Sequence, residues 1–219
     1  MISVKNRKFI VEVVNEIIGD CLISCKIDTS RKEVGHSYGE ILEEVLVDQL
    51  SIKYPKYFKE PEKESGKGKQ TRKMEDMIFI QDNEEYLVNI KFGYEKGGGQ
   101  PNMVSFNRLS KKYAQNIIDS YWILVIDVKG RDAESIEAGV YLFDLYNQLE
   151  YTNFNYGTGQ VMLKEKEFFT NFDPDDYSVP KRKDVIEKMI IMNEESYIRH
   201  IEKKKKQNSK LNRMLADAI

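Results

Sequence analysis

Two short apolar runs, separated by a short polar segment, restrict the fold of this chain more than any other feature. The runs are residues 77–80 and 86–92, and the segment between them contains Gln81, Asp82, Asn83 and Glu84. Runs of this length, rich in Ile, Val, Phe and Tyr and joined by turn-forming residues, are typical of two antiparallel strands. The sequence therefore predicts a β-hairpin at this point of the chain.

The rest of the chain alternates between helical and strand patterns. Apolar spacing predicts helices over residues 11–25 and from Ser37 until Pro55 stops the helix, and a third over 102–118. Strands are expected over 121–128 and 140–146, turns over 153–159, and a long charged helix from 181 that breaks up near Ser209. We therefore predict an α/β fold with a mixed central sheet flanked by helices.

The length of 219 residues suits one compact unit with a helical extension. We expect a single domain over 1–219, with its core at about 35–146 and a C-terminal helical arm at about 181–219. The longest apolar stretch is too short to span a bilayer, and the first residues lack the apolar region of a signal peptide. These features predict a cytoplasmic protein with no membrane partner.

The two cysteines and two histidines exclude several classes of site. Cys21 and Cys25 do not have the redox spacing, and with His36 and His200 they do not give four ligands at zinc-finger spacing. We expect two reduced thiols, and His36 is better explained as a capping or structural residue than as a metal ligand.

The charges are numerous but segregated. The formal net charge of -2 argues against a basic protein that merely coats DNA. Basic residues gather near residues 63–73, 108–112 and 203–206, whereas acidic residues gather near 40–48, 75–76 and 173–176. Such segregation can build a basic cleft with an acidic floor that holds a metal ion. Taken singly, each run is also explained by a solvated surface.

Three polar residues of the predicted hairpin can form a site for phosphodiester chemistry. Asp76 opens the first strand, and Asn89 and Lys91 lie two apart on the second, so that their side chains share one face. Strand pairing can bring Asp76 beside them. Oxygen ligands of this kind can hold Mg²⁺, which lowers the pKa of a bound water, while the lysine positions or deprotonates the attacking water.

Further segments stand in a specific order around these residues. Residues 35–43 read Gly-His-Ser-Tyr-Gly-Glu-Ile-Leu-Glu, residues 74–78 read Met-Glu-Asp-Met-Ile, residues 89–91 read Asn-Ile-Lys, and residues 101–105 read Pro-Asn-Met-Val-Ser. This ordered set, which covers roughly residues 35–128, resembles the PD-(D/E)XK nuclease family. It is most similar to the blunt-cutting restriction endonucleases of the EcoRV and HincII type, where the corresponding helix start is Gly-His-x-x-Gly-Glu-x-x-Glu.

The resemblance implies a PD-(D/E)XK restriction endonuclease-like core and an activity. The core would consist of a helix, three strands, a helix and a strand, with helical extensions at both ends. The activity would be Mg²⁺-dependent hydrolysis of double-stranded DNA at a specific palindromic site, for which an AT-rich sequence is one option, leaving blunt ends with 5′-phosphates. Mn²⁺ is expected to substitute for Mg²⁺, and Ca²⁺ to support binding without cleavage.

The expected site residues fall into three groups. Catalysis is assigned to Asp76, Asn89, Lys91 and Glu40. Metal binding is assigned to Asp76, Asn89, Glu40 and Glu75. DNA binding is assigned to Gly98, Gly99, Gln100, Asn102, Lys67, Lys69, Arg72 and Arg108, because the glycines allow close backbone approach and the basic residues can contact phosphates.

The expected partners are double-stranded DNA, a second copy of the chain and a DNA methyltransferase of the same system, with no direct contact to the methyltransferase. A two-fold homodimer matches a two-fold DNA site. The N-terminal or C-terminal helices would supply the interface, because residues 10–18 have more apolar positions than one helical stripe needs.

Asn89 is the departure from the family pattern, which has a carboxylate at this position. An amide offers one neutral oxygen, so the site would have less negative charge, and Glu40 or Glu75 would have to compensate. On this ground a relative that binds DNA without cutting it stays open. A structure-specific or repair nuclease on the same core is a second alternative.

Overall fold

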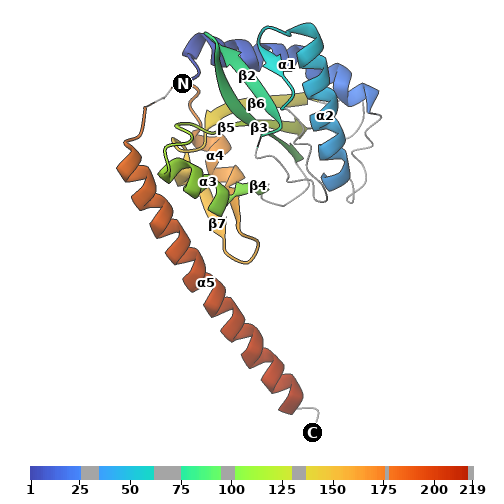
Figure 1. The fold of residues 1–219 in the computed structure, drawn as a ribbon. Helices are drawn as coiled ribbons and strands as arrows, with labels where there is room; N and C mark the ends of the chain where they lie inside the picture. The colour runs from blue at the N-terminus through green and yellow to red at the C-terminus, as the bar shows by residue number, and fades with distance from the viewer. Residues whose placement is uncertain (26–34, 62–74, 95–101, 130–136, 176–177, 217–219) are drawn as a thin grey trace, which may run out of the picture.

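The structure is a computed structural model that describes residues 1–25, 35–61, 75–94, 102–129, 137–175 and 178–216 (Figure 1). A mixed five-stranded sheet lies at its centre, in the order β1-β2-β3-β5-β6. Its strands are β1 (Phe58–Lys59), β2 (Met77–Gln81), β3 (Glu84–Tyr94), β5 (Trp122–Lys129) and β6 (Glu137–Asp144). The predicted mixed sheet with flanking helices is confirmed.

The hairpin of β2 and β3 forms as predicted. Gln81 pairs with Glu84, and the two residues between them, Asp82 and Asn83, have φ angles of 52° and 65°. Positive φ at both central positions is the geometry of a tight two-residue turn whose twist matches that of the strands, and Asp and Asn tolerate it. The turn fixes the antiparallel register of the hairpin, from the pair Gln81–Glu84 next to the turn to the pair Met77–Val88 at the far end.

The third central strand runs parallel to the hairpin's second strand. β5 pairs with β3 in parallel, with Asn89 opposite Ile123 and Lys91 opposite Val125, and β6 pairs with β5 in antiparallel fashion. β5 is apolar on both faces, as a strand covered on both sides requires. The predicted strand over 140–146 begins three residues earlier and ends two residues earlier, at Glu137–Asp144, the span that pairs with β5.

Two helices cover one face of the sheet. They are α1 (Val4–Ser24) and α2 (Gly35–Lys53). Ile10, Val14 and Ile17 of α1 pack with Leu42 and other leucines of α2 against alternate residues of the central strands. The apolar surplus of residues 10–18 is therefore buried within the same chain, and the expectation that it signals a dimer interface is wrong.

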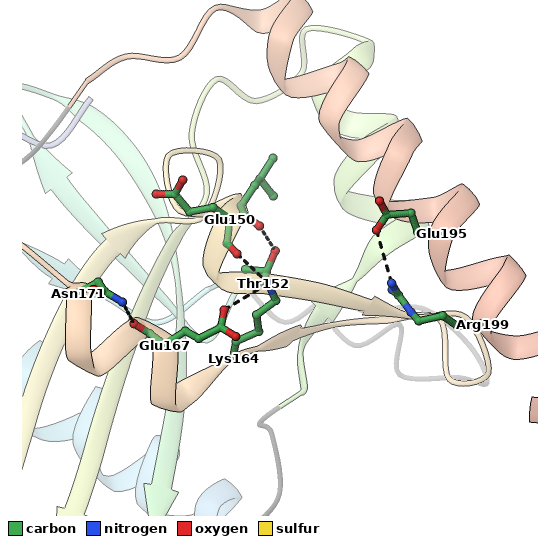
Figure 2. A network of polar contacts seen from close by, with 8 residues as sticks. Glu150, Thr152, Lys164, Glu167, Asn171, Glu195 and Arg199 are labelled. Atoms are coloured by element: carbon green, nitrogen blue, oxygen red, sulfur yellow. Dashed lines mark hydrogen bonds and ion pairs between the residues drawn. The ribbon is translucent and has the colours of Figure 1, made fainter.

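A second layer covers the opposite face. It contains α3 (Phe106–Ala114), α4 (Glu165–Asn171), the start of α5 (Arg182–Ala216), and a three-stranded sheet of order β4-β8-β7. The strands of that sheet are β4 (Asn102–Ser105), β7 (Thr152–Asn155) and β8 (Gln160–Leu163). Figure 2 shows polar contacts of this layer, including Lys164 Nζ donating to the carbonyl of Glu150 at 3.0 Å.

Three expectations about this layer need correction. Residues 102–105 form a strand rather than the start of a helix, because they pair with β8, and the helix that follows ends at Ala114, well before Ile118. Residues 153–159 are one strand and the turn of a β7–β8 hairpin rather than turns alone. The last helix continues past Ser209 to Ala216.

Cys21 and Cys25 are free thiols, as expected. Burial raises the pKa of Cys21 to about 11, which keeps this thiol protonated at neutral pH. Among the helices that the structure describes, none combines the length and apolarity needed to cross a bilayer.

Candidate functional site

Asp76 lies where the chain enters β2, and two hydrogen bonds fix it to β3. Its amide donates to the carbonyl of Val88 at 3.0 Å, and its Oδ2 accepts from the amide of Ile90 at 2.7 Å. A carboxylate that accepts from the neighbouring strand has a fixed orientation, because the backbone donor cannot move without breaking the ladder. The hairpin therefore positions the Asp76 carboxylate directly.

Lys91 brings a positive charge to this carboxylate. Its Nζ lies 3.5 Å from Oδ2 of Asp76 and 3.6 Å from Oε1 of Glu43, and it donates to the carbonyl of Ile90 at 2.6 Å. We call these three residues the Asp76–Lys91–Glu43 cluster. The side chains of Lys91, Glu43 and Asp76 are 17%, 21% and 25% exposed, so the cluster is sheltered yet open to solvent on one side.

Glu43 reaches the cluster from α2. The buried residues Leu42, Leu46 and Leu50 fix the rotation of this helix on the sheet, and Glu43 follows Leu42 directly. The sequence motif favours Glu40 of the same helix, whose side chain lies outside the described residues. Glu43 is thus a site residue that was not assigned from the sequence, although it is part of the motif at 35–43.

Asn89 is buried on β3, with 5% of its surface exposed. It lies two residues before Lys91, so both side chains project from the same face of the strand. A neutral amide at a buried position avoids the cost of burying a further charge beside Asp76. An amide at this position therefore suits its burial in this fold.

The electrostatics of Asp76 combine opposing effects. Burial raises the pKa of the Asp76 carboxyl, while the Lys91 ammonium and the hydrogen bond from the Ile90 amide lower it; the net direction is upward. Burial also raises the pKa of Tyr121 well above its ordinary value, with further contributions from Asp76 and Glu75. The phenol of Tyr121, fully buried just before β5, is therefore within electrostatic reach of both carboxylates and stays protonated.

The donors present fit a magnesium ion better than an ion that needs a complete protein cage. In the described ranges, no three His, Cys, Asp or Glu side chains form a metal-binding group. Asp76 and Glu43 supply two carboxylates within 3.6 Å of the same ammonium, and the Asn89 amide lies on the same strand face. Mg²⁺ is commonly held by one or two carboxylates, with water and phosphate as its other ligands.

The remaining predicted metal ligand, Glu75, is half-buried and precedes Asp76. For the described part of the chain, the contacts that join the cluster do not include it. Its negative charge instead contributes to the raised pKa of Tyr121.

The predicted DNA-binding residues divide into two groups. Lys67, Lys69, Arg72, Gly98, Gly99 and Gln100 lie outside the described residues, as does the side chain of Asn102. Arg108 is exposed on α3, and Asn102 begins β4 rather than a helix. The structure therefore brings together Asp76 and Lys91 of the predicted site, places Asn89 on the strand face of Lys91, and adds Glu43.

Scanning the chain against models of protein families yields no match, and neither does a search of curated proteins.

Proposed function

We propose that this chain is a metal-dependent endonuclease that cuts double-stranded DNA, with a PD-(D/E)XK-like core of the type II restriction kind. The observation that carries the proposal is the Asp76–Lys91–Glu43 cluster, in which one ammonium lies 3.5 Å and 3.6 Å from two carboxylates at the edge of a mixed sheet. Two further features support it. The aspartate opens the first strand of a hairpin, and a parallel strand follows the hairpin's second strand.

Each side chain has a separate role in this proposal. Asp76 would hold Mg²⁺ through Oδ1, which takes part in neither of its contacts to Ile90 and Lys91, and Glu43 and Asn89 would complete the protein ligands directly or through water. The bound ion supplies charge neutralisation at the phosphate and a water of lowered pKa. Lys91 positions the attacking water and stabilises the negative charge that develops on the phosphate.

The products follow from the reaction class. The water oxygen forms a bond to phosphorus as the P–O3′ bond breaks, which leaves a 3′-hydroxyl and a 5′-phosphate. A two-fold homodimer would present one cluster to each strand of a palindromic site. The family resemblance adds the expectation of blunt ends.

The test is incubation of the full chain with a large viral DNA and Mg²⁺, followed by sequencing of the fragment ends. Discrete fragments with one common end sequence are expected. The matched control is Lys91→Met, which keeps most of the volume of the side chain but removes its charge. Equal cleavage by the control would assign the activity to a contaminant or to another site.

One observation favours a second candidate, a relative that binds DNA without cutting it. Asn89 occupies the position of a carboxylate and is buried. Binding to duplex DNA in Ca²⁺ without any cleavage in Mg²⁺ or Mn²⁺ would support this candidate. Cleavage of branched DNA alone would instead indicate a structure-specific nuclease.

A further inference from the structure

The helix α5 is divided into an anchored half and a projecting half. The anchored half packs on the second layer through Val185, Met189 and Ser196. Ser196 Oγ accepts from the amide of Tyr156 at 2.9 Å, and His200 lies against the ring of Tyr156 with 5.5 Å between the ring centroids. Beyond His200 and the half-buried Ile201, the helix extends away from the rest of the fold (Figure 1).

The projecting half is exposed and basic. We call residues 202–216 the arm; every side chain from Glu202 to Met214 is exposed. Between residues 203 and 214 the sequence has six basic residues and no acidic one, in a chain whose formal net charge is -2. The basic residues are Lys203, Lys204, Lys205, Lys206, Lys210 and Arg213.

Four of the six basic residues lie on a stripe next to the side of the helix that packs on the second layer. Seven residues make nearly two full turns, so positions seven apart share one side of a helix, with a drift of about 20°. One such series runs through Met189, Ser196, Lys203 and Lys210. It begins with buried residues and ends with exposed lysines.

A second series on the adjacent side changes in the same way. It starts at the buried Val185 and continues through Met192, Arg199, Lys206 and Arg213. Arg199, the first basic member, pairs with Glu195 at 3.4 Å on the preceding turn (Figure 2). The two series together place Lys203, Lys206, Lys210 and Arg213 on one stripe, which the drift turns by about 40° to 80° from the side of α5 that packs on the second layer.

We propose that the arm is a DNA-backbone contact, whose basic stripe binds the phosphates of duplex DNA held against the body of the protein. The inference rests on the proposed function, which supplies the duplex. The arm is about 20 Å long at 1.5 Å per residue, which equals about six base pairs of duplex. Exposed lysines on a helix that has no acidic residues between them are complementary to the evenly spaced phosphates of duplex DNA. Phosphate contacts of this kind position DNA without reading its sequence.

The test compares salt dependence of binding between the parent and an arm variant of the full chain. The arm variant is Lys203→Gln, Lys206→Gln, Lys210→Gln and Arg213→Gln. The probe is a fluorescent 40-base-pair duplex of random sequence in Ca²⁺. Its binding constant is measured between about 50 and 200 mM KCl, a range over which binding through phosphate contacts weakens strongly. The slope of log K against log salt is negative, and each lost phosphate contact reduces its magnitude by about 0.9. We therefore expect the slope of the arm variant to be smaller in magnitude than that of the parent by about 2 to 4.

Two controls distinguish the effect of the arm residues on DNA binding from the effect of the protein's net charge. The first removes four exposed lysines elsewhere: Lys5→Gln, Lys56→Gln, Lys181→Gln and Lys188→Gln. It is expected to keep the slope of the parent. The second exchanges the four arm residues between Lys and Arg, and is expected to retain binding because the charges remain.

The outcomes distinguish this inference from the proposed function. An arm variant that binds with the slope of the parent, while both proteins cut DNA, contradicts the arm's role and leaves the nuclease in place. A parent that binds no duplex contradicts both. A change in molar mass of the arm variant by light scattering would assign the arm to contact with a second copy of the chain and overturn the proposal.

Discussion

Glu43 of α2 and Lys91 of β3 form an ion pair, with 3.6 Å between Oε1 and Nζ, that joins the helical layer to the edge of the central sheet. Lys91 also lies 3.5 Å from Oδ2 of Asp76, so it is flanked by one carboxylate from a helix and one from a strand. Because all three side chains are largely sheltered from water, removal of either carboxylate changes the position and the environment of the ammonium.

The first prediction concerns this helix carboxylate. Glu43→Gln is expected to lower the cleavage rate about 10- to 100-fold, the usual effect of losing a group that orients a metal site. The measurement is the single-turnover rate at saturating Mg²⁺. Glu40→Gln is the matched companion one helical turn earlier. A larger loss of cleavage rate in Glu40→Gln than in Glu43→Gln would indicate that Glu40, the residue that the family motif favours, is the metal ligand from this helix.

The second prediction concerns the two residues of the hairpin. Asp76→Ala and Lys91→Ala are each expected to reduce cleavage at least about 100-fold, because in the proposed mechanism Asp76 holds the metal ion and Lys91 positions the attacking water. Binding to duplex DNA in Ca²⁺, measured by anisotropy, should stay largely intact. If circular dichroism shows that both variants are unfolded, the two residues are structural and the site lies elsewhere.

The third prediction is that Asp76→Asn raises Tm at neutral pH. Burial raises the pKa of Asp76 above its ordinary value of 3.8, and Lys91 and the Ile90 amide only partly offset this. The stability that such a group contributes is fully present below its unfolded pKa and is lost as the pH rises through the higher folded pKa. At pH 7 the parent therefore bears the cost of a buried charge, which the amide avoids.

Scanning fluorimetry with a chelator checks this expectation. The gain in Tm of Asp76→Asn over the parent should be larger at pH 7 than at pH 4. A lower Tm of the variant at pH 7 would mean that the ion pair with Lys91 outweighs the cost of burial.

The fourth prediction tests the amide of the site. A carboxylate about 4 Å from Mg²⁺ gains several kcal/mol of Coulomb attraction at an effective dielectric near 20. Desolvation offsets most of that gain at a position that is 5% exposed. Asn89→Asp should therefore stay active and reach its half-maximal rate at lower Mg²⁺, whereas Asn89→Ala should lose most activity.

Titration of the cleavage rate against Mg²⁺ at fixed salt compares the three proteins. If Asn89→Ala cuts as fast as the parent, the amide is not a ligand. Asp76 and Glu43 would then be the protein ligands that the structure describes.

The fifth prediction concerns assembly. α5 exposes Ile190, Ile191, Tyr197 and Ile198 on its anchored half, away from the buried Val185 and Met189. Large exposed apolar residues gathered on one element are typical of an interface. We expect a homodimer by light scattering, and a monomer after Ile190→Ser, Tyr197→Ser and Ile198→Ser. A parent that is monomeric both free and on palindromic DNA would contradict the dimer.

Four strands of the central sheet could be predicted from the sequence because they are largely apolar runs, whereas the two-residue β1 was not predicted. β5 carries Trp122 to Val128 with every side chain buried, and such a run needs no knowledge of its neighbours. β4 could not be predicted, because Asn102–Ser105 is a strand only through β8, whose partner residues come more than fifty positions later. β7 was predicted as a turn because it contains Asn153 and Asn155, and asparagine is common in turns.

The site was predictable to the same extent. Asp76, Asn89 and Lys91 follow from the hairpin, because alternation within a strand fixes which side chains share a face. Glu43 does not follow, since α2 carries Glu40, Glu43 and Glu44 in succession. Only the packing of the leucines of α2 on the sheet determines which of these acids faces Lys91.

The parallel pairing of β3 with β5 has a consequence for how this protein can evolve. Tyr94 is paired with Val128, so the two parallel strands end at the same edge of the sheet. Asn89 and Lys91 lie further inside β3, in a register that the hairpin turn and β5 both maintain. Substitutions and insertions beyond Tyr94 and Lys129 can therefore accumulate without moving these two residues. Under the proposed function, we expect selection for new DNA targets to act on residues 95–101 and 130–136 first.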